Sequence, residues 1–235
     1  DVGATQALGS LTAVADTSTT SIFLQNVITT GGQSYTGSLR LAGDLTNTGT
    51  GDMLLAGPVE LTSDVSIINS GAAGDDISIT GAVTSDATAR ALTLGGAGNL
   101  GNVTLLGAAG SPNALSSLTA VGAIISAGSV TSTGTQSYTG DLIANGDLSG
   151  TSISVTGDLL VGVDLTVNAS TSFGVGGTVN SEAAEFNDLT INSPNISLTG
   201  VVGGVDALGA ITTDAGGSLA LGGGAVTTRD GQTWG

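Results

Sequence analysis

The chain has 235 residues, of which 40% are hydrophobic and only 3% aromatic, and its formal net charge is −16. This charge argues against a nucleic-acid partner, because three arginines facing 19 acidic residues cannot form the basic patch that replaces phosphate counterions. No apolar run approaches the roughly 18 to 20 residues that span a bilayer, so we expect no membrane insertion.

The apolar residues are nearly all Val, Leu, Ile and Ala, which suits a narrow and uniform core. The chain contains 40 glycines, and Thr, Ser, Asn and Asp recur between short apolar runs, as they do in turns between strands. Disordered chains are poor in Val, Ile and Leu and rich in charge, whereas only 9% of this chain is charged. We therefore expect a folded protein made of short strands.

Apolar and polar residues alternate with period two in many short runs, which predicts strands with one face inward. In chain order, the clearest of these runs are Asp76–Thr80, Ser152–Thr156 and Asp188–Asn192. No helical period appears, and Gly, Thr, Ser and Val dominate the runs, so almost no helix is expected.

A block of about a hundred residues repeats. Gln33-Ser34-Tyr35-Thr36-Gly37 recurs identically as Gln136-Ser137-Tyr138-Thr139-Gly140, and a degenerate third copy is Gln232-Thr233-Trp234-Gly235. The sequence therefore predicts one domain, 1–235, made of a partial unit (1–32), two units (33–135 and 136–231) and the start of another (232–235).

The tetrapeptide Leu-Thr-Ala-Val also occurs twice, as Leu11–Val14 and Leu118–Val121. Its two copies are 107 positions apart, whereas Tyr35 and Tyr138 are 103 apart. A length difference of four residues is therefore expected between this tetrapeptide and the tyrosine motif.

Short strands with frequent turns fit a sandwich, a barrel or a solenoid. A long repeated block with its turns in order favours the solenoid, because stacked coils copy one another and tolerate insertions in their loops. We predict an all-β parallel β-helix of roughly ten coils, each of about 20 to 25 residues, which would be about 50 Å long.

The tyrosine block and the runs of Gly-Asp-Leu and Leu-Thr-Val type resemble the β-strand repeats of filamentous-haemagglutinin-like bacterial surface proteins and autotransporter-like adhesins. The resemblance implies a right-handed parallel β-helix, export to the cell surface or the extracellular space, and a role as stalk, fibre or adhesin. The expected partners are adjoining repeats or copies of the chain placed end to end, and cell-surface glycans are a further candidate.

The sequence predicts no catalytic residue and no enzyme. His, Cys and Lys are absent, which removes most general bases, covalent nucleophiles and zinc ligands. A carbohydrate-binding or polysaccharide-degrading β-helix is the alternative, and a threonine-lined ice-binding face is a third reading. A groove with clustered carboxylates, or direct ligand binding, would distinguish these readings from a passive fibre.

No cofactor is predicted, and calcium is left open. Gly-Asp turns on successive coils could align oxygen ligands, but the Gly-Gly-x-Gly-x-Asp nonapeptide of calcium-binding β-rolls is missing. Asp75 and Asp76 form the only adjacent acidic pair. They are weak candidates for a metal site, and a simple turn is the favoured interpretation.

Tyr35, Tyr138 and Trp234 occupy equivalent places in the repeat. We expect them to be structural, packing a bend or forming an aromatic stack, in preference to a platform for sugar rings. Because the sequence stops where a third unit would start, it is expected to be either a segment of a longer array or a filament subunit.

Overall fold

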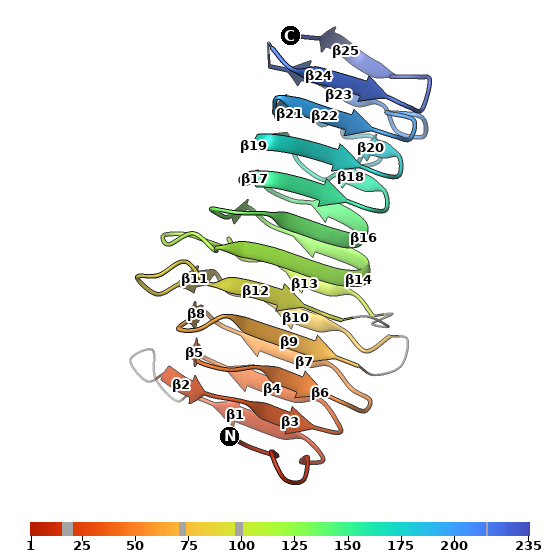
Figure 1. Cartoon of the computed structure of the whole chain (residues 1–235). Helices are drawn as coiled ribbons and strands as arrows, with labels where there is room; N and C mark the ends of the chain where they lie inside the picture. The colour runs from red at the N-terminus through yellow and green to blue at the C-terminus, as the bar shows by residue number, and fades with distance from the viewer. Residues whose placement is uncertain (16–20, 71–73, 97–100, 215) are drawn as a thin grey trace.

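The computed structural model describes residues 1–15, 21–70, 74–96, 101–214 and 216–235. The chain forms an elongated stack of short parallel strands, with the N-terminus at one end and the C-terminus at the other (Figure 1). This confirms the predicted all-β parallel solenoid of about ten turns, and the described residues contain no helix. None of these residues therefore forms a helix that could cross a membrane. The right-handed winding remains a prediction.

Each coil has three sides, and strands on one side pair in parallel with the strands of the coils above and below. Side 1 is formed by β1 (Leu11–Val14), β4 (Gln33–Thr36), β7 (Met53–Ala56), β10 (Ile77–Ile79), β13 (Val103–Leu105), β18 (Leu159–Val161) and β20 (Val179–Ser181). Side 2 is formed by β2 (Ser21–Leu24), β5 (Ser38–Leu41), β8 (Val59–Leu61), β11 (Val83–Ser85), β15 (Val130–Thr131), β21 (Leu189–Asn192), β23 (Leu208–Thr213) and β25 (Thr228–Thr233). Side 3 is formed by β3 (Val27–Thr29), β6 (Leu45–Asn47), β9 (Val65–Asn69), β12 (Ala91–Leu94), β22 (Asn195–Leu198) and β24 (Ser218–Leu221).

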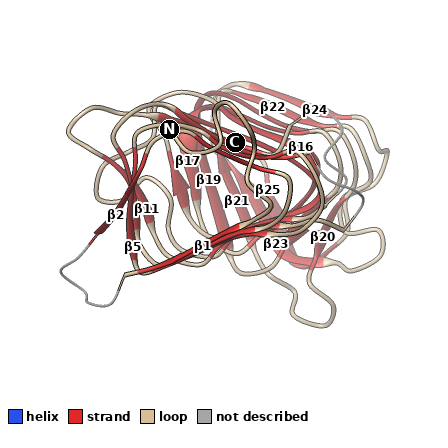
Figure 2. Ribbon diagram, turned by 90° about the horizontal axis from the view of Figure 1, so that it is seen from below, coloured by secondary structure: helices blue, strands red, loops and turns tan. Residues whose placement is uncertain are grey.

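Four longer strands bend around a corner and belong to two sides. They are β14 (Ser117–Ala127) and β16 (Gln136–Ala144), which pass from side 3 to side 1, and β17 (Leu148–Val155) and β19 (Leu165–Val175), which pass from side 2 to side 3. The view along the stack shows the strands surrounding a common interior (Figure 2).

The core follows directly from the period-two pattern. In strands such as β7, β10 and β13, the first and third residues are buried and the second is half-buried. Inward side chains of successive coils stack, so that Met53, Ile77 and Val103 form one ladder. Aliphatic side chains of one coil stack on aliphatic side chains of the next and fill most of this interior. The core therefore needs few aromatic side chains.

Coil length varies more than the sequence suggested. On side 1, Ile125 pairs with Leu142, which gives a coil of 17 residues. Ile77 pairs with Val103, which gives a coil of 26 residues. The strands keep their register, so the corners absorb the difference, as expected for a fold that tolerates loop insertions.

The repeated Leu-Thr-Ala-Val tetrapeptide lies directly beneath the tyrosine motif. Ala13 pairs with Tyr35 in one copy, and Ala120 pairs with Tyr138 in the other. The small alanine side chain leaves room for the phenol of the next coil. The four-residue difference found in the sequence therefore falls within the single coil that separates these two strands.

Candidate functional site

The tyrosine motif builds a buried polar corner inside the solenoid. Tyr35 and Tyr138 are fully buried. The hydroxyl of Tyr35 donates a hydrogen bond to Oε1 of Gln33 over 2.8 Å, and that of Tyr138 donates to Oε1 of Gln136 over 2.9 Å. Each buried phenol thus has a partner two residues earlier on its own strand.

The glutamine amide then closes the corner. Nε2 of Gln33 donates to Oγ1 of Thr29, four residues earlier, and to the carbonyl of Thr46, thirteen residues later in the next coil. Nε2 of Gln136 donates in the same way to Oγ of Ser132 and to the carbonyl of Ser149, over 3.3 and 2.7 Å. We call this arrangement the glutamine clasp, because it joins one corner to the coil above.

The three aromatic residues do not form a column, which corrects the idea of an aromatic stack. Tyr35 lies on side 1, in a ladder that continues through Leu55, Ile79, Leu105 and Ala127. Tyr138 lies on side 3 between Ala120 and Val155. Trp234 directly follows β25 on side 2.

The three motifs are separated along the solenoid by the same number of coils and sides. Four coils above Tyr35 the side-1 ladder reaches Ala127, and the chain then crosses side 2 before Tyr138 on side 3. Four coils above Tyr138 the side-3 ladder reaches Leu221, and the chain then crosses side 1 before reaching Trp234 on side 2. Each copy is therefore turned by one side of the coil relative to the copy before it.

The burial of the tyrosine rings bears on the alternative in which the aromatic residues form a platform for sugar rings. Neither tyrosine ring reaches the surface, so neither can bind a ligand in this structure. Trp234 is 39% exposed, and the side chain of Gln232, two residues earlier, donates to the carbonyl of Val226 over 2.9 Å. The structural interpretation of Tyr35 and Tyr138 accounts for their contacts.

Burial raises the pKa of both phenols far above the ordinary value of about 10. The folded state therefore keeps its two protons at a pH where the unfolded state loses them. This contribution to stability is complete below about pH 10 and is lost as the pH rises through the folded-state values.

We accordingly expect the free energy of unfolding to fall steeply above about pH 10. The measurement is clean, because the chain has no Lys, Cys or His and these two phenols are its only tyrosines. Tyrosinate absorbance should appear together with loss of the strand signal in circular dichroism. In the double variant Tyr35→Phe/Tyr138→Phe this alkaline dependence should disappear, and tyrosinate formation in the fully folded protein would contradict the burial of the rings.

A second network consists of aspartates at the corners. Asp158 Oδ1 accepts a hydrogen bond from the backbone N–H of Thr178, over 2.6 Å, and Asp44 Oδ1 accepts one from Ser66, over 2.7 Å. The aspartates that accept an N–H from the next coil in this way include Asp1, Asp44, Asp52, Asp64, Asp76, Asp141, Asp147, Asp158, Asp164 and Asp188. At a corner the strand ladder is interrupted, and the carboxylate satisfies an N–H that would otherwise lack a protein partner.

Asp75 and Asp76, the weak metal candidates, belong to this corner network. Asp75 Oδ1 accepts the N–H of Gly51, and Asp76 Oδ1 accepts the N–H of Asn102, over 2.9 and 2.8 Å. The two side chains thus bond to different neighbouring coils. Within the described ranges, no group of three or more His, Cys, Asp or Glu residues could hold a metal ion.

We expect Asp158→Ala to lower the free energy of unfolding by about 1 to 2 kcal/mol, because it leaves the N–H of Thr178 without its charged acceptor. Asp158→Asn keeps an acceptor oxygen and should recover most of this loss. Glu185→Ala, at an exposed side chain, serves as the control. Urea denaturation compares the three, and equal stability of Asp158→Ala and the wild type would refute the role of the corner carboxylate.

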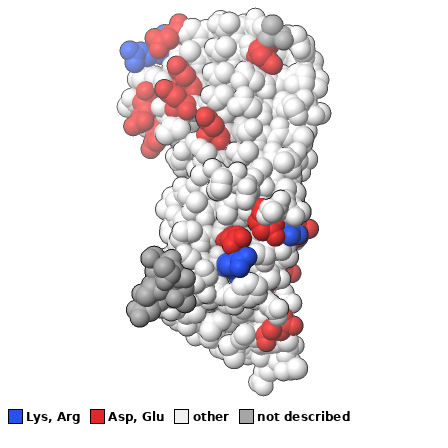
Figure 3. Space-filling model, turned by 90° about the vertical axis from the view of Figure 1, so that its left-hand side faces the viewer, with Lys and Arg blue, Asp and Glu red and all other residues white. Residues whose placement is uncertain are grey.

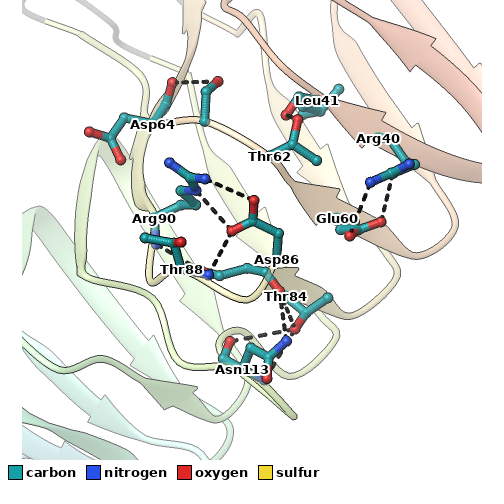
Figure 4. A network of polar contacts seen from close by, with 12 residues as sticks. Arg40, Leu41, Glu60, Thr62, Asp64, Thr84, Asp86, Thr88, Arg90 and Asn113 are labelled. Carbon is teal, nitrogen blue, oxygen red and sulfur yellow. Dashed lines mark hydrogen bonds and ion pairs between the residues drawn. The ribbon is translucent and has the colours of Figure 1, made fainter.

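Charged pairs lie on side 2 and at its corner, in the N-terminal half of the chain (Figure 4). Arg90 donates from Nε and Nη2 to the two carboxylate oxygens of Asp86, over 2.9 and 2.8 Å. The hydrogen bond from Arg90 lowers the pKa of Asp86, assisted by the N–H of Thr88. Arg40 pairs with Glu60 of the next coil over 2.8 Å. Both arginines are thus neutralised by partners within the chain.

Charged side chains gather in a few groups on the face shown in Figure 3, and most of that face is uncharged. Sequence reasoning missed both the aspartate contacts and the glutamine clasp. A signal for the clasp was available: a hydroxyl residue four positions before each motif glutamine, as in Thr29 and Ser132. The hydroxyl residue alone does not reveal the clasp, because the glutamine also donates to a carbonyl in the next coil, and the local sequence does not show which residue lies there.

No protein-family model, curated protein or solved structure matches the chain. What is established is the β-solenoid fold, and the haemagglutinin-like family remains an expectation from the repeat.

Proposed function

We propose that the chain is a rigid structural module, a stalk segment or fibre subunit, of an extracellular surface protein. The observation that carries the proposal is that its polar side chains bond from coil to coil. Corner aspartates, motif glutamines and buried asparagines all bridge neighbouring coils, as Nδ2 of Asn47 does to Oδ1 of Asn69 over 3.0 Å. A stack joined in this way favours a stiff rod.

The surface supports the same role. The 19 acidic residues outnumber the three arginines and give a net charge of −16, which favours solubility and repulsion between neighbouring rods. The extracellular location and the bacterial source are proposed from the resemblance of the tyrosine block and its companion repeats to bacterial surface proteins.

Two experiments test the proposal. A globular marker fused to each end of the chain should appear in electron microscopy as a pair held at a fixed separation of about 50 Å, corresponding to roughly ten coils. A broad range of separations would contradict the rigid role. An antibody against the chain should label intact cells of the source, and labelling only after permeabilisation would contradict the extracellular location.

A further inference from the structure

A shallow groove on side 1 brings carboxylates and aliphatic side chains together on the outer surface. It has a volume of about 250 Å³ and lies over β16 and β18, between β14 and β20. Two parallel rows of outward residues line it, two positions apart along the strands. The first row is Ile124, Asp141 and Asp158, and the second is Ile143, Leu160 and Asn180.

The aliphatic row is open to solvent. Ile143 and Leu160 lie opposite each other on neighbouring coils, and both are half-buried. Ile124, at one end of the acidic row, is 43% exposed. Asn180 closes the other end, where its Oδ1 accepts the N–H of Val205 over 3.1 Å. The groove therefore offers a partner an apolar strip to bury.

Each carboxylate of the acidic row uses one oxygen within the chain. Oδ1 of Asp141 accepts the N–H of Asp158 over 2.9 Å, and Oδ1 of Asp158 accepts the N–H of Thr178. Within the described residues, Oδ2 of neither aspartate accepts a hydrogen bond. All three arginines of the chain pair with other carboxylates. The two stacked charges, about 4.8 Å apart by the spacing of the coils, thus have no arginine to neutralise them.

The first repeat unit has a corresponding groove with different chemistry, on side 2. There the ion pair of Arg40 and Glu60 takes the place of the two aliphatic residues. Ser38 and Pro58 take the places of the two aspartates. The first groove is thus occupied by a charge pair of its own, whereas the second exposes unpaired charge beside apolar surface.

The open groove suits a lysine side chain. An ammonium group can contact two oxygens about 4.8 Å apart at once, and the aliphatic stem can cover the roughly 7 Å between the two rows. A guanidinium pairs best with both oxygens of one carboxylate, and here each carboxylate has one oxygen free. Calcium needs six to eight oxygen ligands, which a groove with an aliphatic edge does not supply. The 235 residues contain no lysine, so none of them can fill the groove.

We propose that the groove formed by Asp141, Ile143, Asp158 and Leu160 binds a partner protein through a lysine flanked by aliphatic residues. The lysine ammonium bridges the free oxygens of the two aspartates, and its aliphatic neighbours cover Ile143 and Leu160. This binding site goes beyond the fibre role and does not depend on it.

The probe is a capped pentapeptide, Ser-Leu-Lys-Leu-Ser, titrated into the isotope-labelled chain and followed by NMR. The backbone N–H signals of Asp158 and Thr178, which donate to the two carboxylates, should shift as peptide is added. Added salt should weaken the binding. The same peptide with acetyl-lysine, which has no charge, should bind at least about fivefold more weakly. Equal binding of the two peptides, or no shift of these signals, would overturn the proposal.

A pair of variants separates the site from the overall charge. Asp141→Asn/Asp158→Asn keeps an acceptor oxygen at each corner and removes both charges, so the affinity for the lysine peptide should fall at least about fivefold. Asp164→Asn/Asp188→Asn is the control, because these aspartates are also stacked, and the strands that follow them carry threonines in place of the aliphatic row. The control should bind the peptide like the wild type. An equal loss in both variants would reveal only long-range attraction and would overturn the site.

The apolar half of the groove is tested by Ile143→Thr/Leu160→Thr. Threonine suits an outward strand position, so the chain should fold, and the affinity for the peptide should again fall about fivefold. Unchanged affinity would overturn the apolar contact. Calcium added in place of the peptide should leave the signals of Asp158 and Thr178 where they are, and a calcium-induced shift would assign the carboxylates to a metal and overturn the lysine proposal.

Discussion

Gly140→Ala is expected to lower the free energy of unfolding by at least about 3 kcal/mol, one of the two largest effects anticipated for this chain. Gly140 has a φ of +133°, a backbone conformation that L side chains rarely adopt. A Cβ atom here would also lie inside contact distance of the carbonyl oxygen of Gly122 in the coil below. Both effects disturb the corner that follows the second tyrosine motif.

Gly174→Ala is the matched control, because a Cβ at Gly174 would meet no atom closer than 3.9 Å. This variant should be as stable as the wild type or slightly more stable, since alanine reduces the freedom of the unfolded chain. Urea denaturation followed by circular dichroism gives both values. Similar stability of the two variants would show that the corner does not require glycine.

Phe173→Ala is expected to destabilise the chain by about 3 to 5 kcal/mol. Phe173 is 1% exposed and stacks between Ile153 and Ile196 on side 3. Removing its ring leaves a cavity, and the backbone ladders above and below hold the neighbouring coils in place, so the interior cannot collapse to fill it.

The same substitution at the surface provides the comparison. Phe23 is 57% exposed and lies beneath the guanidinium of Arg40, whose central carbon is 5.8 Å from the ring centroid. Phe23→Ala should therefore remove no more than about 1 kcal/mol. Thermal or urea unfolding measures both variants, and equal losses would contradict the placement of Phe173 inside the stack.

Much of the fold could be predicted from local patterns. The alternating runs at Asp76–Thr80 and Asp188–Asn192 correspond to β10 and β21, because side chains on a half-buried strand must alternate. Repetition correctly favoured a solenoid over a sandwich. The Leu-Thr-Ala-Val copies could be noticed in the sequence, yet only stacking explains them, because Ala13 and Ala120 are spaced for the tyrosine of the next coil.

The side on which each motif lies could not be predicted. The side of a strand can be found only by counting the corners before it, and the corners differ in length and composition. The identical sequence around Tyr35 and Tyr138 therefore suggested that both lie in one column, whereas they lie on different sides of the solenoid. The role of Asp158 was hidden for a similar reason. Its partner, Thr178, is 20 residues away, and a Gly-Asp turn has the same sequence whether it faces solvent or an N–H of the next coil.

An electron-spin distance between two labelled cysteines tests most directly whether side-1 residues stack one coil at a time along a straight axis. Thr12 and Leu160 are outward residues of one ladder, joined through Ser34, Leu54, Ser78, Thr104, Ser126 and Ile143. Seven steps of about 4.8 Å predict a narrow distribution centred near about 34 Å, before the length of the labels is added. A broad distribution, or one centred well below this value, would contradict the solenoid.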